Sequence, residues 1–200
     1  PTGLLAGGAT DRIAIEVSVA AEAASPLAAA ASVEQTGDPE AGNNHQTVQI
    51  PVRKTDLAIA ISHPGDAVAN GTVPFDVKVS NVGDGETSGE TTVAVELPES
   101  LTGLPGRSGG EGWSCDEDPT GAMLCATSAT IDPGTDGTPL EVRARIDRSA
   151  TGARTVTANV STNGDTGAFD GADQAEDSFE ISVRPDLALG QPVLPHRIGL

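Results

Sequence analysis

The sequence predicts an all-β protein in which Ig-like antiparallel β-sandwiches follow one another as tandem repeats. Apolar and polar residues alternate with period two along much of the 200-residue chain, which is typical of strands with one buried face. The chain holds 24 Gly and 14 Pro, and clusters of Gly, Pro and Asp interrupt the alternation at short intervals, as turns between strands require. One stretch of sequence also recurs later in the chain, which indicates an array of similar domains.

The recurrence divides the chain into one whole repeat and parts of others. Residues 1–38 align without a gap on residues 128–165, so that Pro1 falls on Ser128, and residues 54–59 recur as 184–189. We therefore expect residues 1–54 to be the C-terminal half of a preceding Ig-like repeat. Residues 55–184 are expected to form a complete Ig-like repeat, and residues 185–200 a linker or the start of a next repeat.

The complete repeat is expected to contain about seven strands. The alternating segments predict strands at 56–62, 73–82, 90–97, 139–147, 153–162 and 177–184, with both cysteines inside the segment 101–126. Such a number of short strands with polar turns is typical of a β-sandwich.

The first 54 residues are expected to supply only the last strands of a sandwich, at 12–19, 27–34 and 47–52. Residues 20–31 have a helical composition, but their counterpart contains Thr155-Val156-Thr157, which favours a strand. Half a sandwich leaves an apolar face and strand edges unpaired. Either residues upstream of this segment or another chain would supply the missing strands, and we favour the first.

The two cysteines predict a disulfide across a hairpin. Cys115 and Cys125 flank Asp118-Pro119-Thr120-Gly121, which has the composition of a turn. A metal site would need more Cys or His nearby, and a redox pair is more often Cys-x-x-Cys, so a structural bond is favoured over free thiols or a catalytic role. A disulfide indicates an oxidising compartment, so the protein is expected to be extracellular, secreted or displayed on a cell surface.

The charge excludes two classes of partner. The net charge is −18, whereas nucleic acids and anionic membranes are bound by clustered Lys and Arg. No apolar run approaches the ~20 residues that span a bilayer, so no membrane insertion of this segment is expected. The acidity favours plain solubility, and a halophilic source or bound calcium are the alternatives.

The densest group of carboxylates lies in the loop 164–177. Hard oxygen ligands at such density suit calcium, and the candidate ligands are Asp165, Asp170, Asp173 and Asp177. The spacing does not fit an EF-hand. A solvated acidic loop is the simpler interpretation.

Several motifs in order resemble a known family. They are an opening Asp56-Leu57, a strand that ends in Asn81-Val82-Gly83, a strand that ends in Leu97-Pro98, then Gly112-Trp113-Ser114-Cys115 with Cys125, and a turn at Ile131-Asp132-Pro133-Gly134. This order resembles the conserved Ig-like repeat domain of bacterial and archaeal surface proteins, the "B-antigen-like" repeat of unknown function. The resemblance implies large extracellular proteins in which such domains form stalks, adhesins or surface layers, and it implies no enzymatic activity.

The sequence therefore favours a non-enzymatic spacer of a secreted or cell-surface repeat protein, a stalk or filament element whose partners are neighbouring repeats or identical subunits. No Ser or Cys lies in a recognisable nucleophile elbow that His45, His63 or His196 could serve. One alternative is an adhesive module that binds a surface glycan or protein through its end loops. The other is a filament subunit completed by strand exchange with a neighbour. The aromatic content of 2% favours the spacer, because glycan adhesion commonly uses exposed aromatic rings.

Overall fold

A computed structural model describes residues 5–20, 23–165 and 172–184 of the chain. It contains two compact units, Pro1–Arg53 (unit 1) and Lys54–Leu200 (unit 2). Each unit is described by itself.

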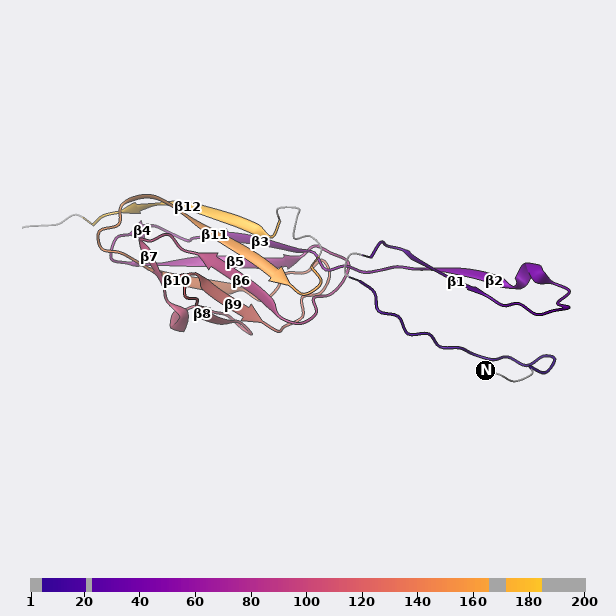
Figure 1. The fold of residues 1–200 in the computed structure, drawn as a ribbon. Coiled ribbons are helices and arrows are strands. Elements are labelled where there is room, and N and C mark those ends of the chain that lie inside the picture. The colour runs from indigo at the N-terminus through magenta and orange to yellow at the C-terminus, as the bar shows by residue number, and fades with distance from the viewer. Residues whose placement is uncertain (1–4, 21–22, 166–171, 185–200) are drawn as a thin grey trace, which may run out of the picture. The chain divides into compact units, whose positions relative to one another are not determined.

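Unit 2 is a sandwich of two β-sheets (Figure 1). Its strands are β3 (Leu57–Ser62), β4 (Ala67–Val68), β5 (Thr72–Asn81), β6 (Thr91–Glu96), β7 (Leu101–Gly103), β8 (Ser114–Glu117), β9 (Met123–Thr127), β10 (Leu140–Ile146), β11 (Gly152–Thr162) and β12 (Gln174–Ser182), and Pro105–Arg107 form a 3-10 turn, η2. One sheet has the strand order β3-β5-β10-β7 and the other β4-β12-β11-β6-β9-β8. All neighbours are antiparallel except the parallel pair β12–β4. The predicted Ig-like β-sandwich is confirmed.

The alternation in the sequence specifies these strands. In β3, Leu57, Ile59 and Ile61 are buried while Ala60 and Ser62 face solvent, and the other long strands repeat this pattern. The predicted strands 56–62, 73–82, 90–97, 139–147 and 153–162 are confirmed to within one or two residues. The strand predicted at 177–184 runs earlier, over Gln174–Ser182, and the segment 101–126 contains β7, β8 and all but the last residue of β9.

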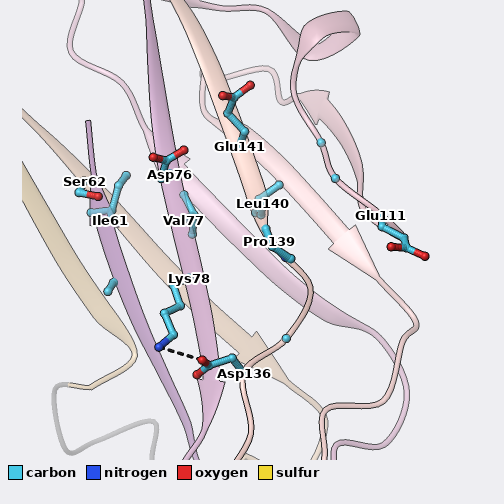
Figure 2. Close-up of a pocket in the computed structure, with 14 residues that line it drawn as sticks. Ile61, Ser62, Asp76, Val77, Lys78, Glu111, Asp136, Pro139, Leu140 and Glu141 are labelled. Carbon is cyan, nitrogen blue, oxygen red and sulfur yellow. Dashed lines mark ion pairs between the residues drawn. The ribbon is translucent and has the colours of Figure 1, made fainter. Parts of the chain in front are cut away.

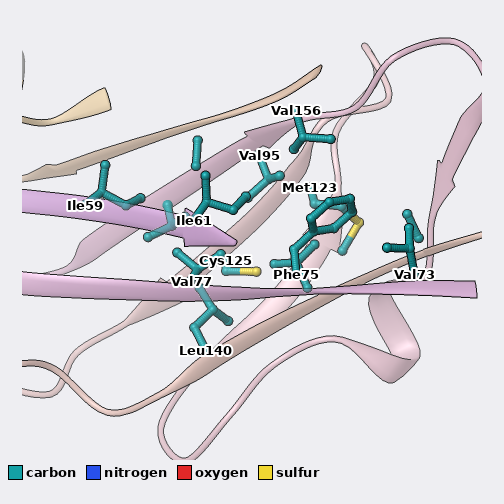
Figure 3. Close-up of a cluster of buried hydrophobic side chains, with 14 of the residues drawn as sticks. Ile59, Ile61, Val73, Phe75, Val77, Val95, Met123, Cys125, Leu140 and Val156 are labelled. Atoms are coloured by element: carbon teal, nitrogen blue, oxygen red, sulfur yellow. The ribbon is translucent and has the colours of Figure 1, made fainter. Parts of the chain in front are cut away.

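The core between the sheets is almost entirely aliphatic (Figure 3). Phe75 on β5 and Phe179 on β12 come from opposite sheets, and their ring centroids lie 5.6 Å apart. Met123 fills the space beside Gly103, where a Cβ would lie within 2.8 Å of the Met123 Cγ. Because each Val or Ile buries less surface than an aromatic ring, the core needs many of them to gain the same stabilisation.

The chain enters and leaves unit 2 at opposite ends of the sandwich. At the start of β3, Thr55 bridges Asp165 and Ile59 N donates to Ala172 O at 2.9 Å, so the end of β11 and the start of β12 lie at the entry end. At the other end, Ile181 of β12 pairs with Ala67 of β4. Figure 1 shows the two ends of unit 2 separated by the length of the strands.

Unit 1 consists of a β-hairpin and extended chain. Its elements are β1 (Leu27–Ser32), a 3-10 turn η1 (Ala41–Asn43) and β2 (His45–Ile50), with β1 and β2 antiparallel. The alanine-rich segment is thus a strand, as its counterpart predicts. Gly37 turns the hairpin with φ +86°, as its counterpart Gly164 does in unit 2 with φ +79°.

The strand predicted at Arg12–Val19 is wrong: these residues are extended but lie in no strand. Their counterparts form β10, which takes its hydrogen bonds from β5 on one side and β7 on the other. Among the described residues of unit 1, no strand pairs with residues 12–19. An alternating pattern therefore becomes a strand only where a neighbouring strand supplies the ladder.

Candidate functional site

The segment that leads into unit 2 is fixed by the loop that follows β5. Lys54 N donates to Asp84 Oδ1 at 2.7 Å, and Lys54 O accepts from Asp84 N at 3.0 Å and from Gly85 N at 2.8 Å. Two residues later, Asp56 O accepts from Val82 N at 2.7 Å and Gly83 N at 3.2 Å. We call residues 54–57 together with residues 82–86 the entry clamp.

The side chain of Thr55 and the absence of one at Gly83 close the entry clamp. Thr55 is buried, and its Oγ1 donates to Glu86 O at 2.8 Å. A Cβ built on Gly83 would lie 2.6 Å from Asp56 N, so the two backbones approach too closely for any other residue. Leu57 N donates to Asp165 Oδ1 at 3.4 Å, which also ties the clamp to the β11–β12 hairpin.

Asn81 supports the clamp from beneath. Its side chain is 1% exposed, and its Nδ2 donates to Gly85 O at 2.8 Å and to Ile131 O at 2.9 Å. Its Oδ1 accepts from Gly83 N at 3.1 Å. The sequence singled out Asn81-Val82-Gly83 only as part of a family resemblance, and the structure gives the motif a physical role: a buried amide that organises the loop holding the entry segment.

The disulfide staples the outer edge of the second sheet. Cys115 on β8 and Cys125 on β9 are direct cross-strand partners with Cα atoms 4.0 Å apart, and they are bonded. Trp113, which precedes β8, is buried in the same core as Cys125, and its indole Nε1 donates to Thr138 O at 3.0 Å. The predicted hairpin disulfide is present.

Three of the four aspartates predicted as calcium ligands lie among the described residues. Asp165 accepts from Leu57 N, and the carbonyl of Asp173 accepts from Val160 N at 2.9 Å. Asp170 lies outside the described residues. Among the residues that the structure describes, no group of three or more His, Cys, Asp or Glu is placed to hold a metal ion.

Asp177 forms a contact between the two sheets. It lies on the inward side of β12, and its Oδ2 is 2.6 Å from Nδ1 of His63, which follows β3 in the opposite sheet. The His63 ring packs 5.0 Å from that of Phe179. The pair links the two sheets beside the aromatic contact of the core. Sequence reasoning missed it, although an acidic residue at an inward position of a strand is a signal that a partner is required.

A groove of about 850 Å³ lies on the outer face of the first sheet (Figure 2). Its lining comes from β3, β5, β10 and the loops that carry Gly109–Glu111 and Asp136–Pro139. Asp76 and Glu141 are direct cross-strand partners within it. Lys78 Nζ lies 2.9 Å from Asp136 Oδ2, and the hydrogen bond from Lys78, with that from Ser80, lowers the pKa of Asp136.

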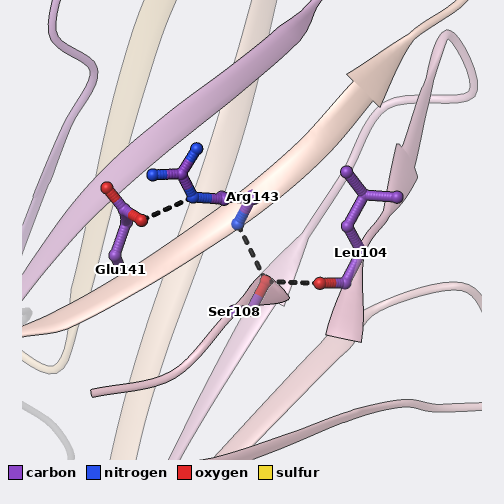
Figure 4. Close-up of polar contacts among 4 residues, drawn as sticks. All are labelled: Leu104, Ser108, Glu141 and Arg143. Carbon is purple, nitrogen blue, oxygen red and sulfur yellow. Dashed lines mark hydrogen bonds and ion pairs between the residues drawn. The ribbon is translucent and has the colours of Figure 1, made fainter. Parts of the chain in front are cut away.

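The wall of this groove is fixed to β10 by a small polar network (Figure 4). Ser108 Oγ accepts from Arg143 N at 2.9 Å and donates to Leu104 O at 3.0 Å. Arg143 Nε lies 2.6 Å from Glu141 Oε1, and Gly109 and Glu141 exchange backbone hydrogen bonds. The loop that carries Glu111 is therefore anchored on both sides of Ser108.

Comparisons with known proteins give similarity to solved structures alone. No protein-family model matches the chain, and no curated protein matches it in sequence. The CARDB domain of a Pyrococcus furiosus protein, solved in complex with di-metal ions, is 16% identical over 66% of this chain and 96% of that domain, with a TM-score of 0.43. A type III cohesin module from the cell-surface anchoring scaffoldin ScaE of Ruminococcus flavefaciens is 12% identical over 63% and 88%, with a TM-score of 0.41.

A cohesin module from a family 33 glycoside hydrolase of Clostridium perfringens is 9% identical over 66% of this chain and 100% of that module, with a TM-score of 0.43. In the part of the chain that the structure describes, no helix is long and apolar enough to cross a membrane.

Proposed function

We propose that this chain is a non-enzymatic structural module of a secreted or cell-surface protein, in which β-sandwiches joined in series act as a stalk or filament element. The observation that carries the proposal is the geometry of unit 2. Its chain enters at the start of β3 and leaves at the end of β12, at opposite ends of the sandwich. Tension applied through the chain would therefore run along the strands.

The strands that bear this tension are paired over most of their lengths. β12 pairs with β11 over eight residues, and β3 pairs with β5 over six. A pull along the strand axis loads all of these hydrogen bonds together, whereas a pull across the strands would open them one at a time. The entry clamp adds backbone hydrogen bonds at the point where force would enter.

The disulfide and the family resemblance support the extracellular setting. A disulfide persists in oxidising compartments. The Cys115–Cys125 bond closes the β8–β9 hairpin, and β9 contributes buried residues to the core. The motif Asn81-Val82-Gly83, which resembles the "B-antigen-like" repeat of surface proteins, builds the entry clamp here. Both observations favour a repeat module exposed outside the cell.

The described histidines support the non-enzymatic part of the proposal. His45 in unit 1 contacts Thr47 at 3.2 Å, and His63 in unit 2 pairs with Asp177 against the ring of Phe179. The first contact is local and exposed, and the second lies beside the aromatic contact of the core. Neither gives a serine or cysteine the adjacent base that nucleophilic catalysis requires.

Single-molecule stretching of the full chain, held by peptide tags at its two ends, tests the proposal. Unit 2 should unfold in one discrete event. Reduction of Cys115–Cys125, which are ten residues apart, should lengthen that event by roughly 35 Å, because the closed loop is released. The doubly substituted variant Cys115→Ala/Cys125→Ala should give the longer event with or without reductant. A unit 2 that extends gradually, with no discrete event at any loading rate, contradicts the structural role.

Adhesion to a protein is the second candidate, and the groove in Figure 2 favours it. Phe75, Trp113 and Phe179 are buried, so these rings are not available to stack on a glycan. The groove instead presents Asp76 and Glu111, which suit a cationic peptide segment. Calorimetric titration with a lysine-rich peptide should give binding that Asp76→Asn/Glu111→Gln weakens. Equal binding by both proteins contradicts this candidate.

A further inference from the structure

The β1–β2 hairpin of unit 1 has the same register as the β11–β12 hairpin of unit 2. Val33 N donates to Asn44 O at 2.9 Å, just as its counterpart Val160 N donates to Asp173 O at 2.9 Å. The strand pairs on either side of these bonds correspond in the same way, and the turn of the second hairpin is two residues longer. The sequence repeat is therefore also a structural repeat.

The matching register identifies which face of unit 1 corresponds to a core face. Ala29 pairs with Val48 as Val156 pairs with Asp177, and Val156 points into the core of unit 2. Because side chains alternate along a strand, Leu27, Ala29 and Ala31 share this face with Val48 and Ile50. We call it the docking face of unit 1.

The docking face is apolar but exposed. Val48 is 54% exposed and Ile50 43%, whereas Val156 in unit 2 is fully buried. The extended segment shows the same contrast, because Ile13, Ile15 and Val17 are exposed although their counterparts on β10 are buried. Apolar side chains thus face water in both the hairpin and the segment before it. Such an exposed apolar surface indicates that a partner normally packs against it.

Unit 2 shows what covers the equivalent surface. There, β10 pairs with β5 and β7, β11 pairs with β6, and β3 packs against β11 and β12. All of these covering strands come from residues 54–127, whereas β10, β11 and β12 follow them in the chain. Unit 1 holds the counterparts of the second group only.

We propose that the docking face of unit 1 is completed by a front-half strand set of the same repeat. This set is a polypeptide with the pattern of residues 54–127. Residues 12–19 then form a strand between the equivalents of β5 and β7, and β1 pairs with the equivalent of β6. This inference does not depend on the stalk function.

A second copy of this chain is the poorer source of these strands. Its own residues 54–127 are already packed against β10, β11 and β12, so a donor would have to open its own core. Both partners would also carry a net charge of −18, and the like charges repel. A strand set that is not already packed into a sandwich has no core to open.

The test is a variant chain in which residues 54–127 are duplicated directly before Pro1. Hydrogen exchange of the amides of residues 13–19 and 30–32 should slow by at least about 100-fold relative to the parent chain, since the new ladders protect them. Unit 2 should exchange as before. If these amides exchange at the same rate in the variant and the parent, the proposal is overturned.

A matched pair of substitutions separates docking from a general effect of the extra residues. In the duplicated chain, Ala29→Asp places a charge at the counterpart of the fully buried Val156 and should abolish the new protection, whereas Ala28→Asp makes the same change on the opposite face and should leave it. Light scattering of the parent chain over a dilution series should show a monomer. A dimer that Ala29→Asp dissociates and Ala28→Asp leaves intact would instead identify a second copy as the occupant and overturn the proposal.

Discussion

Single residues at the entry clamp form hydrogen bonds with backbone groups that no strand ladder reaches. A strand ladder satisfies its own backbone groups, but the chain that leads into a sandwich must satisfy its groups otherwise. Here Asp84 and Gly85 form hydrogen bonds with the backbone of Lys54, and the buried side-chain amide of Asn81 forms them with the backbone of the loop. Loss of one such residue leaves buried polar groups without partners, which is costly.

Gly83→Ala should destabilise unit 2 by about 1–3 kcal/mol, because the added Cβ would force the backbone of Asp56 away and open the clamp. Gly106→Ala is the matched control, because a Cβ there meets nothing within 4 Å. Urea unfolding followed by circular dichroism measures both. Equal midpoints for the two variants would show that the clamp tolerates the displacement.

Lys78→Met should raise the pKa of Asp136 toward its ordinary value, since the hydrogen bond from Lys78 is the main cause of its lowering. A lowered pKa in the folded protein stabilises above the ordinary pKa and loses that contribution as pH falls through the folded value. The variant should therefore lose less stability below about pH 4. Carboxyl NMR titration gives the pKa, with Asp147, whose pKa is lowered by Ser149, as the internal control.

At the scale of elements, β8 depends on a covalent bond more than the inner strands do. It is a four-residue edge strand that pairs with β9 alone, and one of its residues is Cys115. A short edge strand gains little from its ladder, so the disulfide is what retains it.

Reduction of the disulfide should lower the free energy of unfolding by about 2–3 kcal/mol, as expected for a closed loop of this length. Denaturant unfolding with and without a phosphine reductant measures the change. The reductant should leave the Cys115→Ala/Cys125→Ala variant unaffected. If the parent protein is equally stable with and without the reductant, packing alone holds β8 in place.

The strands could be predicted where an alternating sequence pattern coincides with a neighbouring strand that pairs with it. Alternation placed β3, β5 and β10 closely, and the repeat predicted β1 against its alanine-rich composition. Arg12–Val19 has the same pattern as β10 and forms no strand, because pattern records which face is apolar and not whether a partner strand is present.

The candidate sites were harder to predict, because they depend on contacts between residues distant in sequence. The bond between the two cysteines could be predicted, because both residues flank one turn. The His63–Asp177 pair joins residues 114 positions apart, and the entry clamp joins Lys54 to a loop 30 positions away. The calcium site expected at Asp165, Asp170, Asp173 and Asp177 stays a prediction, because Asp170 lies outside the described residues.

At the scale of the whole molecule, charge opposes folding. With 29 acidic and 11 basic residues, compaction brings like charges together, and within the described residues the ion pairs are few and mostly exposed. The aliphatic core has to outweigh this repulsion.

Raising sodium chloride from 10 mM to about 300 mM should raise the urea midpoint of the full chain, because the Debye length falls below the spacing of most surface charges. Calcium chloride at equal ionic strength should give the same rise if the acidic loop is only solvated. An excess stabilisation by calcium that Asp165→Asn removes would identify the loop as a cation site. A midpoint that falls with added salt would contradict the dominance of repulsion.

The separation of entry and exit in unit 2 has a consequence for length. Folded, the module spans about the nine residues of β12, roughly 30 Å. The same polypeptide over residues 55–184, drawn out straight, would reach roughly 450 Å less the loop that the disulfide keeps closed. A tether built of such modules could therefore lengthen many-fold as its modules unfolded one at a time. A sudden pull would unfold modules before the full force reached the anchor.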